Sequence, residues 1–504
     1  MSDSTEQNAE TQDPSQVIES IRQVRIEKAK ALAEAGLDPY HTGPFEKMSA
    51  TDALAKPEGE IVAIAGRVMS SRGMGNVMFG NLHDESGDIQ FMLSKKALED
   101  DSLPENGYKF ISKNLDIGDF VHIEGERMTT KAGEPSVLAH KFKIITKSLR
   151  ALPDKHAGLK NEDVLLRKRY LDILQNPDVQ DMIYKKAKFW KSVRGFLEEQ
   201  NFVEVATPVL EHTTGGGDAA PFVTHHNFLD TDVKLRISTG ELWQKMLLVG
   251  GLEKTFEIGR QFRNESQSRE HANDYEQMEF YWAYANYELG MSLVEDMFKH
   301  MAQETFGTQQ FEMNRFGKVH QIDLSQPWER YDFAETIESQ TGINVHTATD
   351  EEIAKAIAEM GVSHEEEAPN RAKQIDRLWK QCRRNITGPG FLVNELYELS
   401  PLAKKSPDNP AIVERFHVLI AGSELGNGYS ELNDPVDQLE RFEAQQSMRD
   451  AGDEEAQEAN YEFVEALEYG MPPAVGFGMS ERVFSFFMDK SLRECQIFPL
   501  LRKE

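Results

Sequence analysis

"FEIGRQFRNES" (Phe256–Ser266) and "DYEQMEFYWAYA" (residues 274–285) are the two stretches that decide the fold. Both read as successive β-strands joined by a polar loop, which is typical of an antiparallel sheet. In the second stretch Glu279 lies on one face, and Met278 and Phe280 lie on the other. A glutamate on a central strand is costly to bury without a partner. The alternation therefore predicts a strand with one apolar face and one face that receives a cation.

An arginine and a glutamate follow the first of these strands. Arg263 and Glu265 stand two residues apart, so a strand at this point would place them on one face. The planar guanidinium of arginine suits a phosphate or a carboxylate better than a lysine ammonium does. Because most Arg–Glu pairs lie on the surface and contribute little stability, this pair alone is a weak indication of a binding site.

Further carboxylates and a second arginine strengthen that indication. Glu241 lies in "STGELWQKM", and Glu424 and Glu431 lie in "AGSELGNGYSELND", where glycines let the backbone approach a ligand. "GFGMSERVFSFF" places Arg482 at the start of an expected helix, a position that favours phosphates. The arginines predict a polyphosphate site with a divalent cation on a carboxylate. The glutamates predict a small cationic guest such as an ammonium group.

The composition limits the classes of function. The chain has 504 residues, with 56 Lys+Arg, 85 Asp+Glu and a formal net charge of −29. Such acidity argues against a broad basic surface for nucleic acid, although a local basic site is compatible with it. Cys382 and Cys495 form no CxxC motif, and we expect free buried thiols in a cytoplasmic protein. We also expect no membrane span and no signal peptide.

The first part of the chain reads as a tail, a helical extension and a small barrel. Residues 1–14 are polar and acidic, as in a disordered tail. Residues 15–57 form the extension, in which Ile21 and Val24 recur at helical spacing after Val17. Residues 58–150 contain five short apolar runs separated by turn residues, which predicts a five-stranded OB-fold barrel.

The rest of the chain reads as a linker and a larger α+β domain. Residues 151–174 form the expected linker, and 175–504 form a domain with an antiparallel sheet and packed helices. Two charged amphipathic helices near 340–385 read as an insertion in this domain. The sequence has no GxGxxG or P-loop motif, so a Rossmann or P-loop nucleotide site is not expected.

These stretches, taken in order, resemble the class II lysyl-tRNA synthetases along nearly the whole chain. The three family motifs resemble "GFLEEQNFVEVATPVL", "FEIGRQFRNES…DYEQMEF" and "GFGMSERVFSFF". Other segments similar to the family are "LPDKHAGL", "RKRYLDIL", "PFVTHHN", "SPLAKK" and "ELGNGYSELNDP". The resemblance implies an OB-fold anticodon-binding domain followed by a class II catalytic domain. It also implies an ATP-dependent ligase that uses Mg²⁺, forms lysyl-adenylate and transfers L-lysine to tRNA(Lys).

The resemblance implies roles for individual residues, with Arg263 and Arg482 as the catalytic pair. Arg263 would bind the ATP α-phosphate beside the lysine carboxylate, and Arg482 would lie near the γ-phosphate. The further ATP-binding residues that it implies are Glu265 at the adenine amino group, His271 near the phosphates, Tyr275 stacked on adenine and Glu424 on the metal. The implied lysine-binding residues are Gly216, Glu241, Arg263, Glu279, Tyr281, Asn427 and Glu431. A pocket of carboxylates suits an ammonium, because neutral side chains would leave buried charge unpaired.

The resemblance also extends to tRNA and to a second copy of the chain. Arg67, Phe79, Gln90 and Glu134 match anticodon-reading positions in the barrel, where bases are read by stacking and by edge hydrogen bonds. From the residues alone, Phe79 would more readily be a core side chain. Pro208 matches the proline at the family's dimer interface, so a homodimer is expected.

Several departures from the family pattern concern the predicted site. Glu270 stands directly before His271, where an arginine is usual, so one γ-phosphate contact is not expected here. His417 stands seven residues before Glu424, where the family has a metal-binding glutamate. Histidine is a poor ligand for Mg²⁺, so Glu424 is expected to hold the metal with waters and phosphate oxygens. "ANDYE" and "MSER" also differ from the common motifs, and "STGELWQ" is one residue longer than usual.

Three alternative functions share part of this pattern. A paralogue that attaches lysine to a protein would not carry the barrel. An aspartyl- or asparaginyl-tRNA synthetase would need a cation in its pocket, where this chain has Glu241 and Glu431. A non-catalytic RNA-binding descendant is compatible with His417, but Arg263 and Arg482 argue against it.

Overall fold

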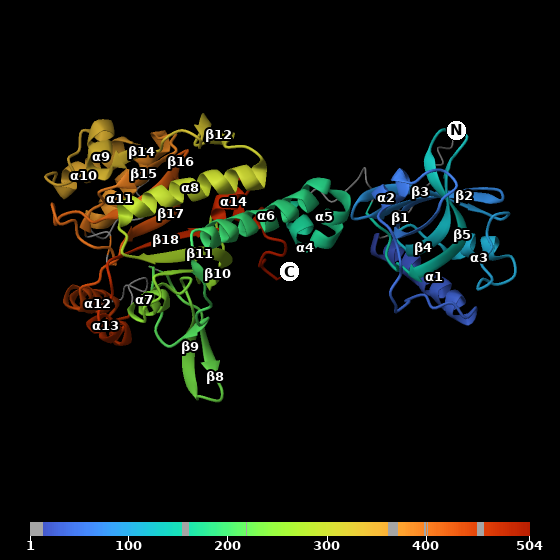
Figure 1. The fold of residues 1–504 in the computed structure, drawn as a ribbon, viewed down its shortest axis with the longest axis horizontal. Helices are drawn as coiled ribbons and strands as arrows, with labels where there is room; N and C mark the ends of the chain where they lie inside the picture. Colours follow the sequence, from blue (N-terminus) through green and yellow to red (C-terminus); the bar gives the residue numbers. More distant parts are fainter. Residues whose placement is uncertain are drawn as a thin grey trace, which may run out of the picture. The chain divides into compact units, whose positions relative to one another are not determined.

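The computed structural model describes residues 14–153, 161–217, 219–360, 371–397, 400, 402–450 and 458–503. The chain divides into two compact units, Met1–Lys160 and Asn161–Glu504 (Figure 1). The tail expected over 1–14 lies outside the described residues except for Pro14, and so does most of "LPDKHAGL". The domain limits drawn from the sequence stay predictions.

The first unit contains a closed barrel with the strand order β1-β2-β3-β5-β4, which confirms the predicted OB-fold. All neighbouring strands are antiparallel except β3 and β5. The strands are β1 (Ile61–Met74), β2 (Val77–Asp84), β3 (Gly87–Ser94), β4 (Phe120–Thr129) and β5 (Pro135–Thr146). The helices are α1 (Pro14–Glu34), α2 (Ala50–Ala55) and α3 (Gly107–Asn114). Alternate apolar residues of the strands, such as Leu82 and Phe91, fill the barrel interior.

Helix α1 lies in the helical extension expected over 15–57, but the face marked by Ile21 and Val24 is not the buried one. Ile21 and Val24 are 38% and 54% exposed, whereas Arg25, Ala29 and Leu32 are buried. These three residues follow an i, i+4, i+7 pattern and so share a face. The guanidinium of Arg25 donates to two backbone carbonyl oxygens near the end of the barrel, which draws a charged residue inward.

The second unit is built on an eight-stranded sheet with the order β14-β15-β16-β17-β18-β11-β10-β6. Its inner pairs are antiparallel, and the outer pairs β14–β15 and β10–β6 are parallel. The strands are β6 (Val203–Glu204), β10 (Lys254–Phe262), β11 (Asp274–Ala283), β14 (Glu329–Asp332), β15 (Gly390–Val393), β16 (Arg415–Ile420), β17 (Ser423–Ser430) and β18 (Ala474–Ser480). The predicted α+β class with an antiparallel sheet is confirmed.

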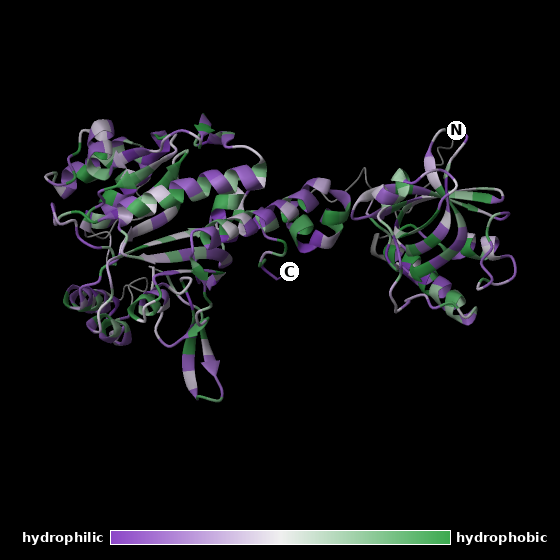
Figure 2. Cartoon of the chain, in the orientation of Figure 1, coloured by the Kyte–Doolittle hydropathy of each residue, from purple (hydrophilic) through white to green (hydrophobic). Residues whose placement is uncertain are grey.

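Two long helices cover one face of this sheet. Helix α8 (Tyr287–Phe306) packs against β16, β17 and β18, and α6 (Pro177–Glu199) packs beside it (Figure 1). In Figure 2 the viewed side of α8 is mainly hydrophilic, whereas hydrophobic residues gather on the strands beneath it. Met278 and Phe280 of β11 are fully buried in this core. Glu279 therefore points to the opposite face, as the alternation of the sequence predicted.

The stretch "VEVATPVL" (residues 203–210) does not form one continuous strand. Only β6 (Val203–Glu204) and β7 (Leu210–Glu211) are extended pairs, and Pro208 lies between them. Proline has no backbone N–H for a ladder. Thr207 beside it donates its N–H and hydroxyl to the Glu257 carboxylate, at 2.9 and 2.7 Å, instead of to a neighbouring strand.

The remaining elements surround the sheet. They are α4 (Glu162–Arg167), α5 (Arg169–Gln175), β8 (Val223–His226), β9 (Thr231–Leu235), α7 (Glu241–Val249), β12 (Gln310–Arg315), β13 (Lys318–Asp323), α9 (Phe333–Thr341), α10 (Asp350–Glu359), α11 (Arg371–Cys382), a 3₁₀ turn (Arg383–Asn385), α12 (Pro435–Asp450), α13 (Tyr461–Glu468), α14 (Arg482–Phe487) and α15 (Leu492–Cys495). Helices α10 and α11 are the pair expected near 340–385, apart from residues 361–370, which lie outside the described chain. They pack with α9 in a second apolar cluster, which also includes Leu392 of β15 and Leu419 of β16.

Two simple expectations can be compared with the structure directly. Cys382 and Cys495 are both free and buried, as predicted. Among the described helices, none is both long and apolar enough to cross a membrane.

Candidate active site

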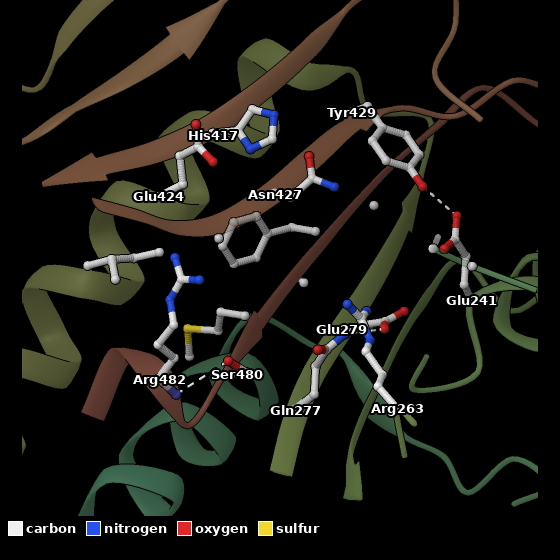
Figure 3. A pocket seen from close by; sticks show the side chains of 18 of the residues that line it. Glu241, Arg263, Gln277, Glu279, His417, Glu424, Asn427, Tyr429, Ser480 and Arg482 are labelled. Atoms are coloured by element: carbon white, nitrogen blue, oxygen red, sulfur yellow. Dashed lines mark hydrogen bonds between the residues drawn. The ribbon is translucent and has the colours of Figure 1, made fainter. Parts of the chain in front are cut away.

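A cavity of about 410 Å³ opens on the face of the sheet away from α8. Strands β11, β17 and β18 and the loop after β10 supply most of its wall (Figure 3). It brings together all the catalytic, ATP-, lysine- and metal-binding positions that the sequence predicted, namely Gly216, Glu241, Arg263, Glu265, His271, Tyr275, Glu279, Tyr281, Glu424, Asn427, Glu431 and Arg482. Glu270 and His417, two of the departures from the family pattern, line the same cavity.

Glycines keep this cavity open. Gly216 has φ +86°, and a Cβ on it would lie 2.5 Å from both Glu241 Oε2 and Ser238 Oγ. On β18, a Cβ on Gly476 would overlap Glu431 Oε1 and the Tyr281 ring. A side chain at either position would therefore occupy the space in front of a glutamate.

One end of the cavity is a cluster of buried carboxylates. Glu241, Glu279 and Glu431 are 6%, 4% and 1% exposed. Glu279 accepts hydrogen bonds from the Thr239 N–H at 2.8 Å and the Tyr281 hydroxyl at 3.0 Å. Burial raises the pKa of Glu279 to about 7 and that of Glu431 to about 8. Among the described residues, Glu431 Oε1 has no hydrogen-bond partner, which leaves a buried acceptor facing the cavity.

A lysine that the sequence reading missed lies behind these carboxylates. Lys245 on α7 is 1% exposed, and its Nζ lies 2.9 Å from Glu241 Oε1 and 2.6 Å from Glu431 Oε2. Burial alone would lower the pKa of Lys245, but the two carboxylates outweigh it and raise the pKa. Its i, i+4 spacing from Glu241 was the only sign of this pair in the sequence.

Arg263 and Glu265 reach the cavity from a loop and not from a strand. Strand β10 ends at Phe262, so the expected shared strand face is wrong. The Asn273 side chain instead donates to the carbonyl oxygens of Arg263 and Glu265, at 2.9 and 2.6 Å. These two hydrogen bonds hold the loop in place. The Arg263 guanidinium lies 6.0 Å from the Tyr275 ring centre.

The other end of the cavity carries arginines. Arg482 begins α14, and its Nε lies 3.9 Å from Glu270 Oε2. Glu270 also pairs with Arg315 Nη1 at 3.2 Å, so it joins two guanidinium groups. Desolvation and the positive charge of Arg482 lower the pKa of His271, which favours a neutral imidazole at this end.

Glu424 is held ionised between cations and an indole. Its Oε1 accepts from Trp379 Nε1 at 2.7 Å, and Arg383 Nη1 lies 3.7 Å from Oε2. Burial would raise the pKa of Glu424, but His417 and Arg383 outweigh burial and lower it to about 2. Trp379 and Arg383 come from the helical insertion, and no motif in the sequence marked them.

The donor set around Glu424 is poor in oxygen ligands from the protein. His417 Nε2 lies 3.4 Å from Glu395 Oε2, and the same oxygen lies 2.8 Å from Arg415 Nη1. His417 therefore faces a carboxylate that is already ion-paired with Arg415. In the described part of the chain no three His, Cys, Asp or Glu side chains form a metal cage. Glu424 alone fits Mg²⁺, which commonly takes its other ligands from water and phosphates.

The anticodon-binding positions predicted in the barrel lie on its outer surface. The register pairs Arg67 with His83 and Phe79 with Met92, and Gln90 lies two residues before Met92, so these side chains share the outward face. Phe79 is half-buried and does not belong to the core of the barrel. Of the other positions, Arg67 and Gln90 make contacts within the barrel, and Glu134 is exposed.

Those contacts differ from residue to residue. Arg67 donates to the Gly118 carbonyl oxygen at 3.0 Å and stacks on the Phe120 ring at 4.2 Å. Gln90 accepts from the Ser136 hydroxyl at 2.8 Å, whereas Glu134 is exposed. Glu134 and Phe79 are thus more available to a ligand than Arg67.

Comparisons with known proteins agree with this architecture. Residues 161–502 match the family model for "tRNA synthetases class II (D, K and N)", and residues 62–145 match the "OB-fold nucleic acid binding domain". The chain is 40% identical over 487 residues to a protein of Moorella thermoacetica, covering 95% of this chain and 97% of that protein. It is 37% identical over 499 residues to one of Fervidobacterium nodosum, covering 97% and 95%.

A third relative, from Staphylococcus haemolyticus, is 37% identical over 501 residues, covering 96% of this chain and 98% of that protein. All three carry the name lysine--tRNA ligase. Full-length similarity of this kind, together with both domain matches and the carboxylate-lined cavity, assigns the family. The chain belongs to the class II tRNA synthetases and, within them, to the lysine--tRNA ligases.

Proposed function

We propose that this chain activates L-lysine with ATP and Mg²⁺, releasing pyrophosphate, and transfers the lysyl group to the 3′ end of tRNA(Lys). The observation that carries the proposal is one cavity with buried carboxylates at one end, Arg263 in the loop between, and Arg482 with Glu424 at the other end. A substrate with two ammonium groups matches the first end, and a polyphosphate matches the second.

The carboxylate end is the lysine subsite. Glu241, Glu279 and Glu431 bind the ammonium groups, and the unpartnered Glu431 Oε1 supports this role. Asn427 and Tyr281 line the subsite, and Gly216 closes it. An arginine at Arg263 suits the substrate carboxylate, since a guanidinium binds a carboxylate through two hydrogen bonds.

The arginine end is the ATP subsite. Glu265 accepts from the adenine amino group, Tyr275 stacks on the adenine ring, and His271 lies near the phosphates. Arg482 binds toward the γ-phosphate. Glu424 is the residue that holds magnesium, which, when bound, neutralises charge that develops on the phosphates.

Charge stabilisation and positioning supply the acceleration in both steps. In the first step a carboxylate oxygen of lysine attacks the α-phosphorus, and the bond to the β-phosphate oxygen breaks. Arg263 offsets the charge on the α-phosphate, and Arg482 offsets that on the leaving pyrophosphate. In the second step the terminal ribose hydroxyl of tRNA attacks the lysyl carbonyl carbon, and AMP leaves. No side chain forms a covalent intermediate.

The barrel binds the anticodon through Phe79, Gln90 and Glu134, with Arg67 supporting that surface. The outward position of Phe79 supports stacking on a single-stranded base, worth about 1–3 kcal/mol per base. The further parts of the proposal are a homodimer, with Pro208 at its interface, and a cytoplasmic location.

Lysine-dependent ATP–pyrophosphate exchange tests the proposal, with ornithine, arginine and aspartate for comparison and with a magnesium titration. Exchange with lysine far above the other amino acids is the expected result. Exchange with aspartate would assign the chain to another branch of the class. A folded chain that binds tRNA without exchange with any amino acid would instead support a non-catalytic RNA-binding role.

A further inference from the structure

Resting on the proposed lysine-binding function, we infer that Lys245 is a positioning residue that sets the charge of the amino-acid subsite. It neutralises one of three buried carboxylates and leaves two negative charges for a substrate with two ammonium groups. Lys245 lies outside the cavity lining, so it acts through Glu241 and Glu431 and not by touching the substrate.

The contacts of Lys245 fix which carboxylate oxygens remain available. Its Nζ is ion-paired with Oε1 of Glu241 and with Oε2 of Glu431. The other oxygens face the glycines of the cavity wall, since a Cβ on Gly216 would meet Glu241 Oε2 and one on Gly476 would overlap Glu431 Oε1. One ammonium group behind the wall thus turns one oxygen of each glutamate toward the cavity.

Aromatic rings hold the ammonium in this position. The Nζ of Lys245 lies 5.9, 5.5 and 5.9 Å from the ring centres of Tyr281, Tyr429 and Phe463. The Tyr429 hydroxyl also donates to Glu241 Oε1. A cation among ring faces and two carboxylates remains charged without water.

The charge balance follows from the groups that face Lys245. They are Glu241 on its own helix, Tyr281 on β11, and Tyr429 with Glu431 at the end of β17. Glu279 completes the cluster, since its charge acts on Glu431. Burial raises the pKa of both tyrosines well above the ordinary value, so both stay neutral. In the lysine-bound subsite, where all three carboxylates are ionised, three carboxylates and one ammonium sum to minus two. The two ammonium groups of lysine complete the balance, while the substrate carboxylate pairs with Arg263.

Calorimetric titration of the full chain with L-lysine, in buffers of different ionisation enthalpy, measures both the affinity and the protons released. For K245M we expect about 100-fold weaker binding, since an unpaired buried carboxylate takes up a proton. That proton must leave on binding, so K245M releases about one proton more per lysine than the unaltered chain. K245R keeps the charge and therefore the original proton count.

K299M is the matched control, because Lys299 pairs with Glu295 at the same i, i+4 spacing on α8, at 2.6 Å, outside the site. K299M should bind lysine with the affinity and the proton release of the unaltered chain. ATP binding without lysine checks that each variant is folded, and K245Q carries the same expectation should K245M fail to fold.

Two results would overturn the inference while lysine binding by the unaltered chain stands. One is a folded neutral variant with unchanged affinity and proton count. The other is an equal loss in K245R and the neutral variants with no change in protons, which would reduce Lys245 to a packing role. If the unaltered chain neither binds lysine nor catalyses lysine-dependent exchange, the proposed function itself fails.

Discussion

The carboxylate of Glu424 has only one oxygen free of a hydrogen bond to Trp379, and Arg383 Nη1 lies 3.7 Å from that oxygen. The cavity wall around Glu424 therefore offers a metal ion less negative charge than a pair of carboxylates would. Two single-residue changes in this cavity, at His417 and at Glu431, give direct predictions.

H417E should shift the magnesium dependence of ATP binding to about tenfold lower Mg²⁺, because a second carboxylate adds an oxygen ligand beside Glu424. ATP affinity, measured calorimetrically at a series of free Mg²⁺ concentrations, reports this without turnover. H417Q is the control, since it removes the imidazole without adding charge. Equal shifts in both variants would contradict the prediction.

Lysine binding should strengthen as pH rises toward about 8, where burial sets the pKa of Glu431. Below that pH the empty subsite holds Glu431 protonated, and a neutral carboxyl cannot pair with an ammonium. The dissociation constant for lysine should therefore fall by up to tenfold per pH unit up to this point and then level. E431Q should bind weakly and lose the dependence between about pH 7 and 8, above the pKa of Glu279. A flat profile for the unaltered chain, measured by equilibrium titration, would oppose the assignment.

At the scale of elements, the wall of the cavity depends on backbone that comes close to side chains. Gly216 combines a left-handed conformation with contacts to Glu241 and Ser238 that leave no room for a methyl group. The strands contribute differently, because alternation along β11 sends Glu279 to the cavity and Met278 to the core.

G216A should raise the dissociation constant for lysine by about 100-fold while leaving ATP binding within about threefold, because the methyl group displaces the Glu241 carboxylate. Binding of each ligand alone, by calorimetry, separates the two effects. G251A is the control: Gly251 has φ +92° but no atom within 4 Å of an added Cβ, so it carries the backbone strain alone. Equal losses in both variants would show that strain and not the contact is responsible.

The sequence was informative wherever contacts are local or periodic. Alternation predicted both faces of β11, and turn residues predicted the five strands of the barrel. Resemblance to the family motifs selected residues that the structure places around one cavity. Long-range contacts could not be predicted from the sequence. Trp379 and Glu424 are 45 positions apart, and no local sequence pattern indicates that they form a hydrogen bond. The face of α1 was misjudged because Arg25 binds backbone carbonyls far along the chain.

At the scale of the whole molecule, charge is the dominant property. A chain with a net charge of −29 repels a polyanion over most of its surface, so tRNA must be held by local cations. The binding free energy then depends on a few phosphate contacts and on the counterions that they release.

Affinity for tRNA(Lys) should accordingly fall by at least about 100-fold between about 50 and 200 mM salt. Fluorescence anisotropy with labelled tRNA measures the slope, and lysine-dependent pyrophosphate exchange at the same salt concentrations is the control, because it requires no tRNA. An affinity that stays constant while exchange also stays constant would contradict local electrostatic binding.

The hydrogen bond from Trp379 to Glu424 joins a peripheral helical insertion to the phosphate end of the cavity. The helices of this insertion pack in an apolar cluster that also includes Leu392 of β15 and Leu419 of β16. Any substitution that moves the indole also affects the carboxylate that we propose for the metal. Substitutions in α11 that move Trp379 can therefore change how related proteins bind the nucleotide and its metal, even where every motif residue is the same.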